Sequence, residues 1–218
     1  MTIIPNKVLV TGAGRSGTSA FMKFLYQYID TDLLISKQNS SHHDIRAKDL
    51  SYNANLTREW NLSSNAGLEY IVEKKSSKKI IEASPYIFKD PRICVTLDWI
   101  CKKRIFNVEH VFVLIRDYRK SALSRQDKDM WWLEYGPIRC ANPNKSTLSN
   151  QIDFNQRMIG KLMETISIYD IPHTIINFPK FVENKEYLYE KLKGTPLQIK
   201  KEKLDSAFDV LEKKQVNF

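Results

Sequence analysis

The chain has 218 residues, of which 42% are hydrophobic and 27% are charged. These are ordinary values for a globular protein, and the length suits one domain with a substantial core, which we expect over residues 1–218. No apolar stretch approaches the length of a membrane span, and Met1 to Lys7 lacks the charged-then-apolar layout of a signal peptide. We therefore expect a soluble, cytoplasmic protein.

Lysine and arginine outnumber aspartate and glutamate by 34 to 25, which gives a formal net charge of +9. Such an excess suits anionic ligands, from nucleotides and acidic glycans to nucleic acid, without choosing among them. The three cysteines are Cys94, Cys101 and Cys140. This odd, sparse set has no Cys-x-x-Cys pair, which argues against a disulfide framework or a zinc site and fits a reducing compartment.

The first informative stretch is an apolar run, Val8 to Val10, that stops at a glycine-rich segment. The run predicts a buried strand, and the apolar pattern that begins at Phe21 predicts a helix. Between them lie three glycines and three hydroxyl residues: Gly12, Gly14, Ser16, Gly17, Thr18 and Ser19. A strand, a glycine-rich turn and a helix N-terminus form an anion cradle, because free N–H groups and the helix dipole point at one spot. We expect a phosphate-like group to bind here.

Two known phosphate loops fit this segment incompletely. The P-loop of nucleoside triphosphatases has the spacing of Gly12 and Gly17, but Thr18 stands where its lysine should be. The dinucleotide pattern G-x-G-x-x-G matches at Gly12, Gly14 and Gly17, but no acidic residue closes a second strand about 20 residues further on. A P-loop-type kinase or hydrolase therefore stays an alternative.

The loop carries a cation of its own, Arg15, followed by Ser-Gly-Thr-Ser. This resembles the 5′-phosphosulfate loop of sulfotransferases that use 3′-phosphoadenosine 5′-phosphosulfate (PAPS). The match is closest to bacterial members with an Arg-Ser-Gly-Thr-Ser loop. The resemblance implies a P-loop-like α/β fold in which Gly14, Arg15 and the N–H groups and hydroxyls of residues 16–19 hold the 5′-phosphosulfate.

Residues 36–79 are rich in Asn, Ser and Lys, and we interpret them as a flap or an insertion on the acceptor side. Transfer of a sulfuryl group to a hydroxyl needs a base within reach of that hydroxyl, and histidine titrates in the useful range. His42 and His43 suit this role by place and chemistry, with Asp44 as a substitute. An exposed polar loop without a catalytic role is the alternative.

The next motif is a short apolar strand from Tyr86 that runs into Lys89-Asp90-Pro-Arg92. Lys-Asp-Pro resembles a motif of tyrosylprotein sulfotransferases, and Lys-Asp-Pro-Arg one of the bacterial enzymes, which implies that Lys89 neutralises charge on the transferring group. For Asp90 and Arg92 we favour a structural ion pair that braces the loop.

A second phosphate motif lies at His110 to Arg116, an apolar strand that ends in an arginine, with Ser124 eight residues further on. The pair can clamp one phosphate only if the residues between them form a helix. The family's 3′-phosphate motif has this strand, arginine and serine spacing, so the resemblance implies that Arg116 and Ser124 hold the 3′-phosphate.

The remaining pattern predicts an amphipathic helix from about Ser149 to Tyr169, a strand over His173 to Asn177 and a helix over Phe181 to Leu192. Strands that alternate with helices indicate an α/β fold with a mostly parallel sheet. For His110 and His173 we favour structural roles.

The resemblance implies a sulfotransferase that moves a sulfuryl group from PAPS to a hydroxyl or amine, with adenosine 3′,5′-bisphosphate as product. The catalytic residues would be Arg15, Lys89 and one of His42 and His43. We expect no metal, because arginine and lysine already neutralise the donor. The acceptor, a glycan, a lipid or a small molecule, is left open. A basic nucleic-acid-binding protein is a further alternative, but it rests on net charge alone.

Overall fold

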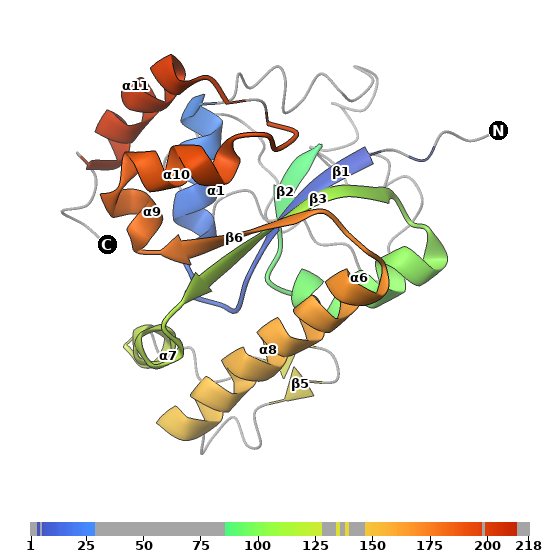
Figure 1. Ribbon diagram of the computed structural model, residues 1–218. Helices are drawn as coiled ribbons and strands as arrows, with labels where there is room; N and C mark the ends of the chain where they lie inside the picture. The colour runs from blue at the N-terminus through green and yellow to red at the C-terminus, as the bar shows by residue number, and fades with distance from the viewer. Residues whose placement is uncertain are drawn as a thin grey trace, which may run out of the picture.

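The computed structural model describes residues 4, 6–28, 86–127, 134–135, 138–139, 147–197 and 199–212 (Figure 1). Its main sheet has four parallel strands in the order β2-β1-β3-β6, and β4 and β5 form a separate antiparallel pair. The strands are β1 (Asn6–Thr11), β2 (Ile87–Lys89), β3 (Asn107–Arg116), β4 (Glu134–Tyr135), β5 (Ile138–Arg139) and β6 (His173–Phe178). The predicted α/β fold with a parallel sheet is confirmed.

The helices follow the strands along the chain, as the sequence pattern predicts. They are α1 (Thr18–Tyr28), α6 (Ile93–Lys103), α7 (Tyr118–Gln126), α8 (Leu148–Ile168), α9 (Lys180–Glu183), α10 (Lys185–Leu192) and α11 (Lys201–Glu212). Side chains cap three of these helices. The Asp117 carboxylate accepts from the Lys120 N–H, the Thr147 hydroxyl accepts from the Asn150 N–H, and Asn184 caps α10. Among the described residues, no helix is both long enough and apolar enough to cross a membrane.

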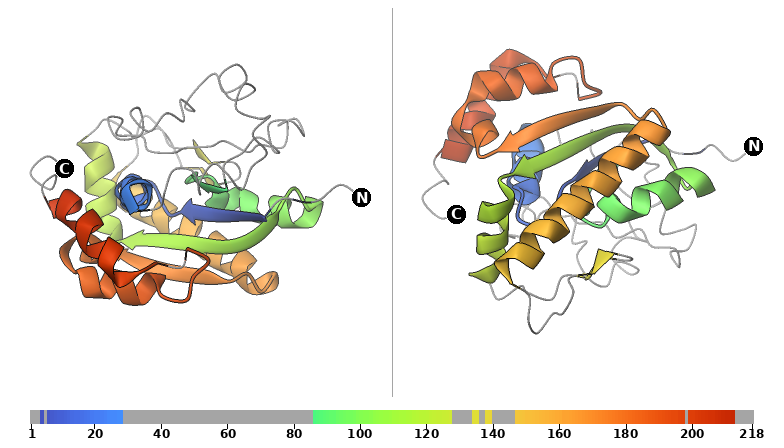
Figure 2. Two further views of the ribbon diagram at one scale, coloured as in Figure 1. Left: turned by 90° about the horizontal axis from the view of Figure 1, so that it is seen from above. Right: turned by 60° about the horizontal axis from the view of Figure 1, so that its bottom comes forward.

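Helices cover both faces of the main sheet (Figure 1). On one face, α1 and α9 to α11 pack against every second side chain of β1 and β3, namely Val8, Val10, Phe112 and Leu114. On the other face, α6 and α8 pack against Leu9, Val111 and Val113. The right-hand view of Figure 2 shows α8 running across the strands with α1 behind them. This three-layer arrangement buries β1, β2 and the middle of β3 on both faces, which explains why these strands are apolar without alternation.

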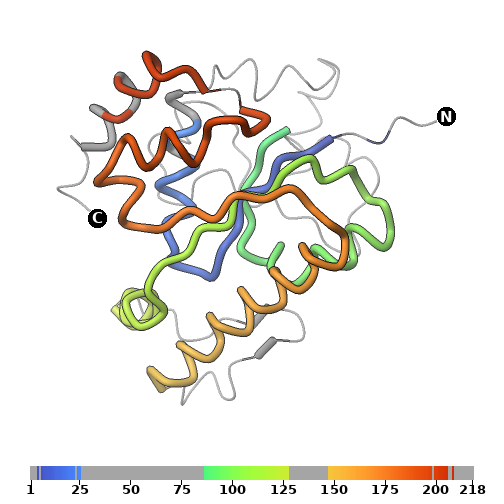
Figure 3. Tube along the Cα trace, in the orientation of Figure 1, coloured from blue at the N-terminus to red at the C-terminus, as the bar shows by residue number. Residues whose placement is uncertain are grey.

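The chain changes direction in the sheet between β1 and β3. From β1 it runs outward to β2 through α1, and from β2 it crosses back over β1 to β3 through α6. Ligands of open α/β sheets bind outside the carboxyl ends of the strands at such a switch point. Figure 3 shows the loop that follows β1 beside the carboxyl end of β3. Both phosphate motifs of the sequence end at this place.

One predicted helix is divided in two. The sequence predicts a helix over Phe181 to Leu192, but α9 ends at Glu183 and α10 begins at Lys185. Asn184 between them is extended, and its side chain accepts a hydrogen bond of 2.8 Å from the Tyr187 N–H. Asparagine competes for backbone groups in this way, so it starts a new helix rather than continuing the old one.

The predicted flap over 36–79 lies outside the described residues.

Candidate functional site

The loop after β1 is held against β3 at a distance that only glycine allows. A Cβ atom on Gly12 would lie 2.3 Å from the Leu114 carbonyl oxygen and 2.5 Å from the Ser16 hydroxyl. Gly17 has φ +92°, and a Cβ there would lie 2.6 Å from the Phe178 ring. The first helical hydrogen bond of α1 runs from the Phe21 N–H to the Gly17 carbonyl. The glycine-rich turn therefore brings a helix N-terminus to the switch point, as the sequence predicts.

Arg15 lies at the outer turn of this loop, with a left-handed backbone at φ 69°. Its Nε donates a hydrogen bond of 3.2 Å to the Ser124 hydroxyl, and its carbonyl accepts one of 3.4 Å from Arg116 Nη1. The side chain is exposed. Arg116 and Ser124, which the sequence predicts to clamp one phosphate together, thus both contact Arg15, and the two phosphate motifs form one cluster.

Arg116 leaves the end of β3 and lies over the Phe178 ring at the end of β6, 5.1 Å from its centroid. Burial and the nearby positive charge of Arg15 lower the pKa of Arg116, while Asp117 acts in the opposite direction. Its Nε is buried and has no hydrogen-bond partner in the described part of the chain. Two repelling cations with an unused donor favour an anion between them.

The hydroxyl of Ser16 is the second buried polar atom without a partner among the described residues. Ser16 is 2% exposed and lies inside the loop, next to Gly12. Buried polar groups are nearly always hydrogen-bonded, so this hydroxyl is available to a bound ligand. The unsatisfied atoms of Ser16 and Arg116, together with the glycine cradle, fit the phosphate groups of a nucleotide such as PAPS.

Lys89 ends β2 on the other side of β1, and its ammonium group donates a hydrogen bond of 2.9 Å to the Ser19 hydroxyl. The residue is 2% exposed, and a lysine this deeply buried is normally paired with polar groups, as Lys89 is with Ser19. The contact places a second cation at the first turn of α1, beside Thr18, which is also buried. Lys89 therefore joins the loop residues at one site, as its position at a strand end predicts.

Asp90 and Arg92 form an ion pair directly after Lys89. The Asp90 carboxylate accepts hydrogen bonds from the backbone N–H, Nε and Nη2 of Arg92 at 2.8 to 3.1 Å. The Thr11 hydroxyl donates a hydrogen bond to the Asp90 carbonyl. Burial raises the pKa of the nearby Cys94 thiol to about 12. The ion pair expected between Asp90 and Arg92 is present, and Cys94 is a core residue rather than a nucleophile.

The histidines divide into two groups. His42 and His43, the expected bases, lie outside the described residues. His110 is buried in β3, and its Nε2 lies 2.9 Å from the Thr174 hydroxyl. Burial, assisted by the charge of His173, lowers the pKa of His110 to about 4, which keeps its ring neutral. These contacts agree with the structural role favoured for His110.

Two residues of the site were not predicted as functional residues from the sequence. Phe178 contacts Gly17 and Arg116, but it lies one residue beyond the predicted strand. Arg125 follows Ser124 and donates a hydrogen bond of 2.8 Å to the Gly14 carbonyl. For Phe178, the carboxyl end of a strand is a usable signal. For Arg125 there is none, because an arginine in a polar helix is usually exposed.

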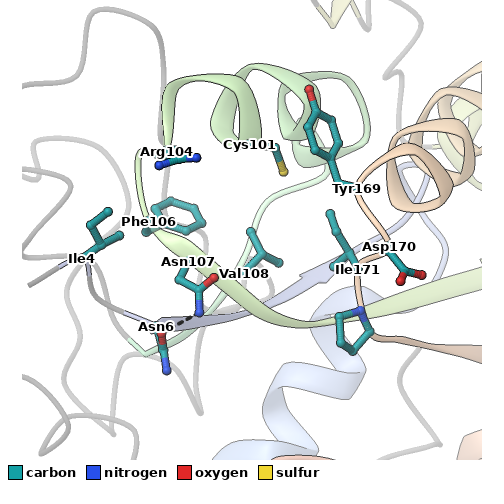
Figure 4. Close-up of a pocket in the computed structure, with 11 residues that line it drawn as sticks. Ile4, Asn6, Cys101, Arg104, Phe106, Asn107, Val108, Tyr169, Asp170 and Ile171 are labelled. Atoms are coloured by element: carbon teal, nitrogen blue, oxygen red, sulfur yellow. Dashed lines mark hydrogen bonds between the residues drawn. The ribbon is translucent and has the colours of Figure 1, made fainter.

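A hollow of about 640 Å³ lies at the opposite edge of the sheet, where β1 and β3 begin (Figure 4). Its lining includes Phe106, Tyr169 and Cys101, and its charged members are Arg104 and Asp170. Two other lining residues are joined by a hydrogen bond of 2.8 Å, which Asn107 Nδ2 donates to Asn6 Oδ1. Ligand sites of open α/β sheets lie at the other edge, so we place the candidate site at the glycine loop.

No model of a known protein family matches this chain, and a search of curated proteins finds no match. The assignment of the site therefore rests on the residues and contacts described above.

Proposed function

We propose that the protein is a PAPS-dependent sulfotransferase. One observation carries the proposal: Arg15, in a glycine loop at a helix N-terminus, contacts both Arg116 and Ser124, which lie more than one hundred residues away in the chain. Among the described residues, neither arginine forms an ion pair with a carboxylate. The cluster therefore offers two cations, a hydroxyl and free N–H groups to a ligand that carries several anionic groups.

PAPS supplies an activated sulfuryl group, which is bonded to its 5′-phosphate. When this group is transferred to the acceptor, adenosine 3′,5′-bisphosphate is the leaving group. In this proposal Arg15 and the N–H groups at the start of α1 bind the 5′-phosphosulfate, and Arg116 with Ser124 binds the 3′-phosphate. Lys89, held by Ser19 near the same helix N-terminus, neutralises charge that develops on the transferring and leaving oxygens.

The protein's part in the reaction is positioning and charge neutralisation. The acceptor oxygen forms a bond to sulfur as the bond from sulfur to the phosphate oxygen breaks, and the acceptor proton passes to a base. His42 and His43 remain the predicted bases. The acceptor class, the cytoplasmic location and the absence of a metal requirement also remain predictions.

Calorimetric titration tests the donor site without knowledge of the acceptor. We expect adenosine 3′,5′-bisphosphate to bind without magnesium in the micromolar range, and adenosine 5′-monophosphate to bind at least about tenfold more weakly, because it lacks the charged group that Arg116 would contact. Arg116→Ala should abolish this preference. Arg119→Ala is the matched control, since Arg119 is exposed on α7 two residues after Asp117.

The same titration separates the alternatives. Tighter binding of ATP with magnesium than of adenosine 3′,5′-bisphosphate would overturn the proposal in favour of a P-loop-type kinase or hydrolase. Equal binding of both adenosine phosphates in the wild type and in Arg116→Ala would overturn the assignment of the 3′-phosphate to Arg116.

A further inference from the structure

Arg125 is the largest of the described side chains that are fully buried, and it lies next to the proposed phosphate-binding Ser124 on α7. Its guanidinium donates four hydrogen bonds to described residues on two other parts of the chain. Nη1 donates to the Gly14 carbonyl at 2.8 Å, and Nε donates to Gln151 Oε1 at 2.7 Å. Nη2 donates to the Gln151 carbonyl at 3.1 Å and to Asn155 Oδ1 at 2.7 Å.

The contact between Arg125 and Gly14 lies next to a second contact between the same two segments. Arg125 donates a hydrogen bond to the Gly14 carbonyl. Ser124, which precedes Arg125, accepts a hydrogen bond from Arg15, which follows Gly14. Two adjacent residues of α7 are thus tied to two adjacent residues of the glycine loop. A shift of α7 along the loop would break both hydrogen bonds together, so the Arg125 contact helps to keep Arg15 and Ser124 in place for one ligand.

The other side of Arg125 is fixed to α8. Gln151 and Asn155 are one helical turn apart, and both are fully buried. Asn155 also donates to the Tyr118 carbonyl at the start of α7, and Phe154 places its ring 5.8 Å from the Arg125 guanidinium carbon. α8 itself packs in the core with α6. Arg125 therefore connects the glycine loop to a helix that packs in the core.

A buried guanidinium tolerates few arrangements of its surroundings. Removal of a charged group from water costs free energy, and this cost is offset only when the donors of the group are satisfied in good geometry. The planar guanidinium has donors at fixed angles, whereas lysine has one ammonium group that can rotate. Gly14, Gln151 and Asn155 must consequently keep the positions that this one side chain dictates.

We propose that Arg125 is a positioning residue of the donor site, which holds the glycine loop and Ser124 in the register that lets Arg15, Ser124 and Arg116 bind one anionic ligand. The inference rests on the proposed function for the identity of that ligand, but not for the connection between loop and helix.

The first test is amide hydrogen exchange of the ligand-free protein, compared between wild type and Arg125→Lys. We expect faster exchange of the amides of residues 14–17 in the variant, with unchanged exchange in β3. Arg157→Lys is the matched control, since Arg157 is 64% exposed on α8 and pairs with Asp153. Unchanged loop exchange in a folded Arg125→Lys protein would overturn the proposal. If that variant does not fold, Asn155→Ala, which removes one acceptor of Arg125, takes its place with the same expected result.

The second test is a double-mutant cycle on the affinity for adenosine 3′,5′-bisphosphate. Arg125→Lys should weaken binding about tenfold to a hundredfold, because small misplacements of binding groups have effects of this size. In a Ser124→Ala background the same substitution should cost clearly less, since Arg125 acts through the Ser124 and Arg15 pair. Equal losses in both backgrounds would show a general loss of stability and contradict the positioning role. Wild-type protein that does not bind this nucleotide would refute the proposed function, while the exchange measurement would still decide on Arg125.

Discussion

Two loops at the same edge of the sheet are held in opposite ways. The loop after β2 has an ion pair of its own, between the Asp90 carboxylate and Arg92 two residues away, in addition to a hydrogen bond from Thr11 to the Asp90 carbonyl. The loop after β1 is braced from outside, by Leu114 against Gly12, Arg125 on Gly14 and Phe178 against Gly17. In the first loop the arginine charge is neutralised by the protein itself. In the second, the charges of Arg15 and Arg116 meet no carboxylate among the described residues.

The difference separates a structural turn from a binding turn. A loop with an internal ion pair keeps its shape whether or not a ligand is bound, and it leaves no charge for that ligand. A loop held by distant contacts can present unsatisfied donors, because the rest of the fold supplies the free energy that keeps them in place. Four substitutions test this contrast between the two loops.

Gly12→Ala should have the largest effect. The new methyl group would meet the Leu114 carbonyl, which belongs to a central strand and cannot move aside. We expect the free energy of unfolding to fall by about 3 kcal/mol and binding of adenosine 3′,5′-bisphosphate to be lost. Urea denaturation and calorimetry measure the two effects. Gly160→Ala is the matched control, because a Cβ on Gly160 in α8 meets nothing within 4 Å. Wild-type stability of Gly12→Ala would show that the loop is not held against β3.

Arg15→Ala should affect binding but not stability. We expect the affinity for adenosine 3′,5′-bisphosphate to fall about a hundredfold, because a charge-assisted contact to the ligand is removed. The free energy of unfolding should change by less than about 1 kcal/mol, since the side chain is exposed and alanine keeps the same backbone strain at φ 69°. Chemical denaturation beside calorimetry checks both values. A large loss of stability with unchanged affinity would reverse the roles assigned to the two loops.

Arg92→Ala should give the opposite result. Its loss leaves the Asp90 carboxylate, whose side chain is 5% exposed, without three of its hydrogen bonds to the Arg92 side chain. We expect the free energy of unfolding to fall by about 2 kcal/mol. Affinity for the nucleotide should stay within about threefold of wild type. A drop in affinity as large as that of Arg15→Ala would place Arg92 in the binding site and remove the contrast.

Ser124→Ala should have the smallest effect. The Ser124 hydroxyl accepts one hydrogen bond from Arg15 at 3.2 Å, and an ordinary hydrogen bond contributes about 1 kcal/mol. We therefore expect nucleotide affinity to fall about fivefold, with unfolding unchanged. Ser121→Ala would be a poor control because Ser121 is buried, so Gln126→Ala, on the exposed end of α7, serves instead. Equal affinities of wild type and Ser124→Ala would exclude Ser124 from the donor site.

The sequence was sufficient for several features that depend on near neighbours. The strand, glycine loop and helix of residues 8–28 were predictable because apolar runs, glycines and hydroxyl residues act within a few positions of the chain. The ion pair of Asp90 with Arg92 was predictable for the same reason. The position of Arg116 followed from the rule that parallel strands end at one edge of the sheet.

The tertiary structure alone decided which of these parts meet and how they are held. The contact of Arg15 with Ser124 spans 109 positions and that of Arg125 with Gly14 spans 111, so no local pattern encodes either of them. Arg125 looks like any surface arginine in the sequence, and it becomes a buried connection only because α7 packs on α8. The division of the predicted helix at Asn184 has a similar origin, since a helix-capping side chain competes with the continuing helix and the packed chain determines which arrangement is more stable.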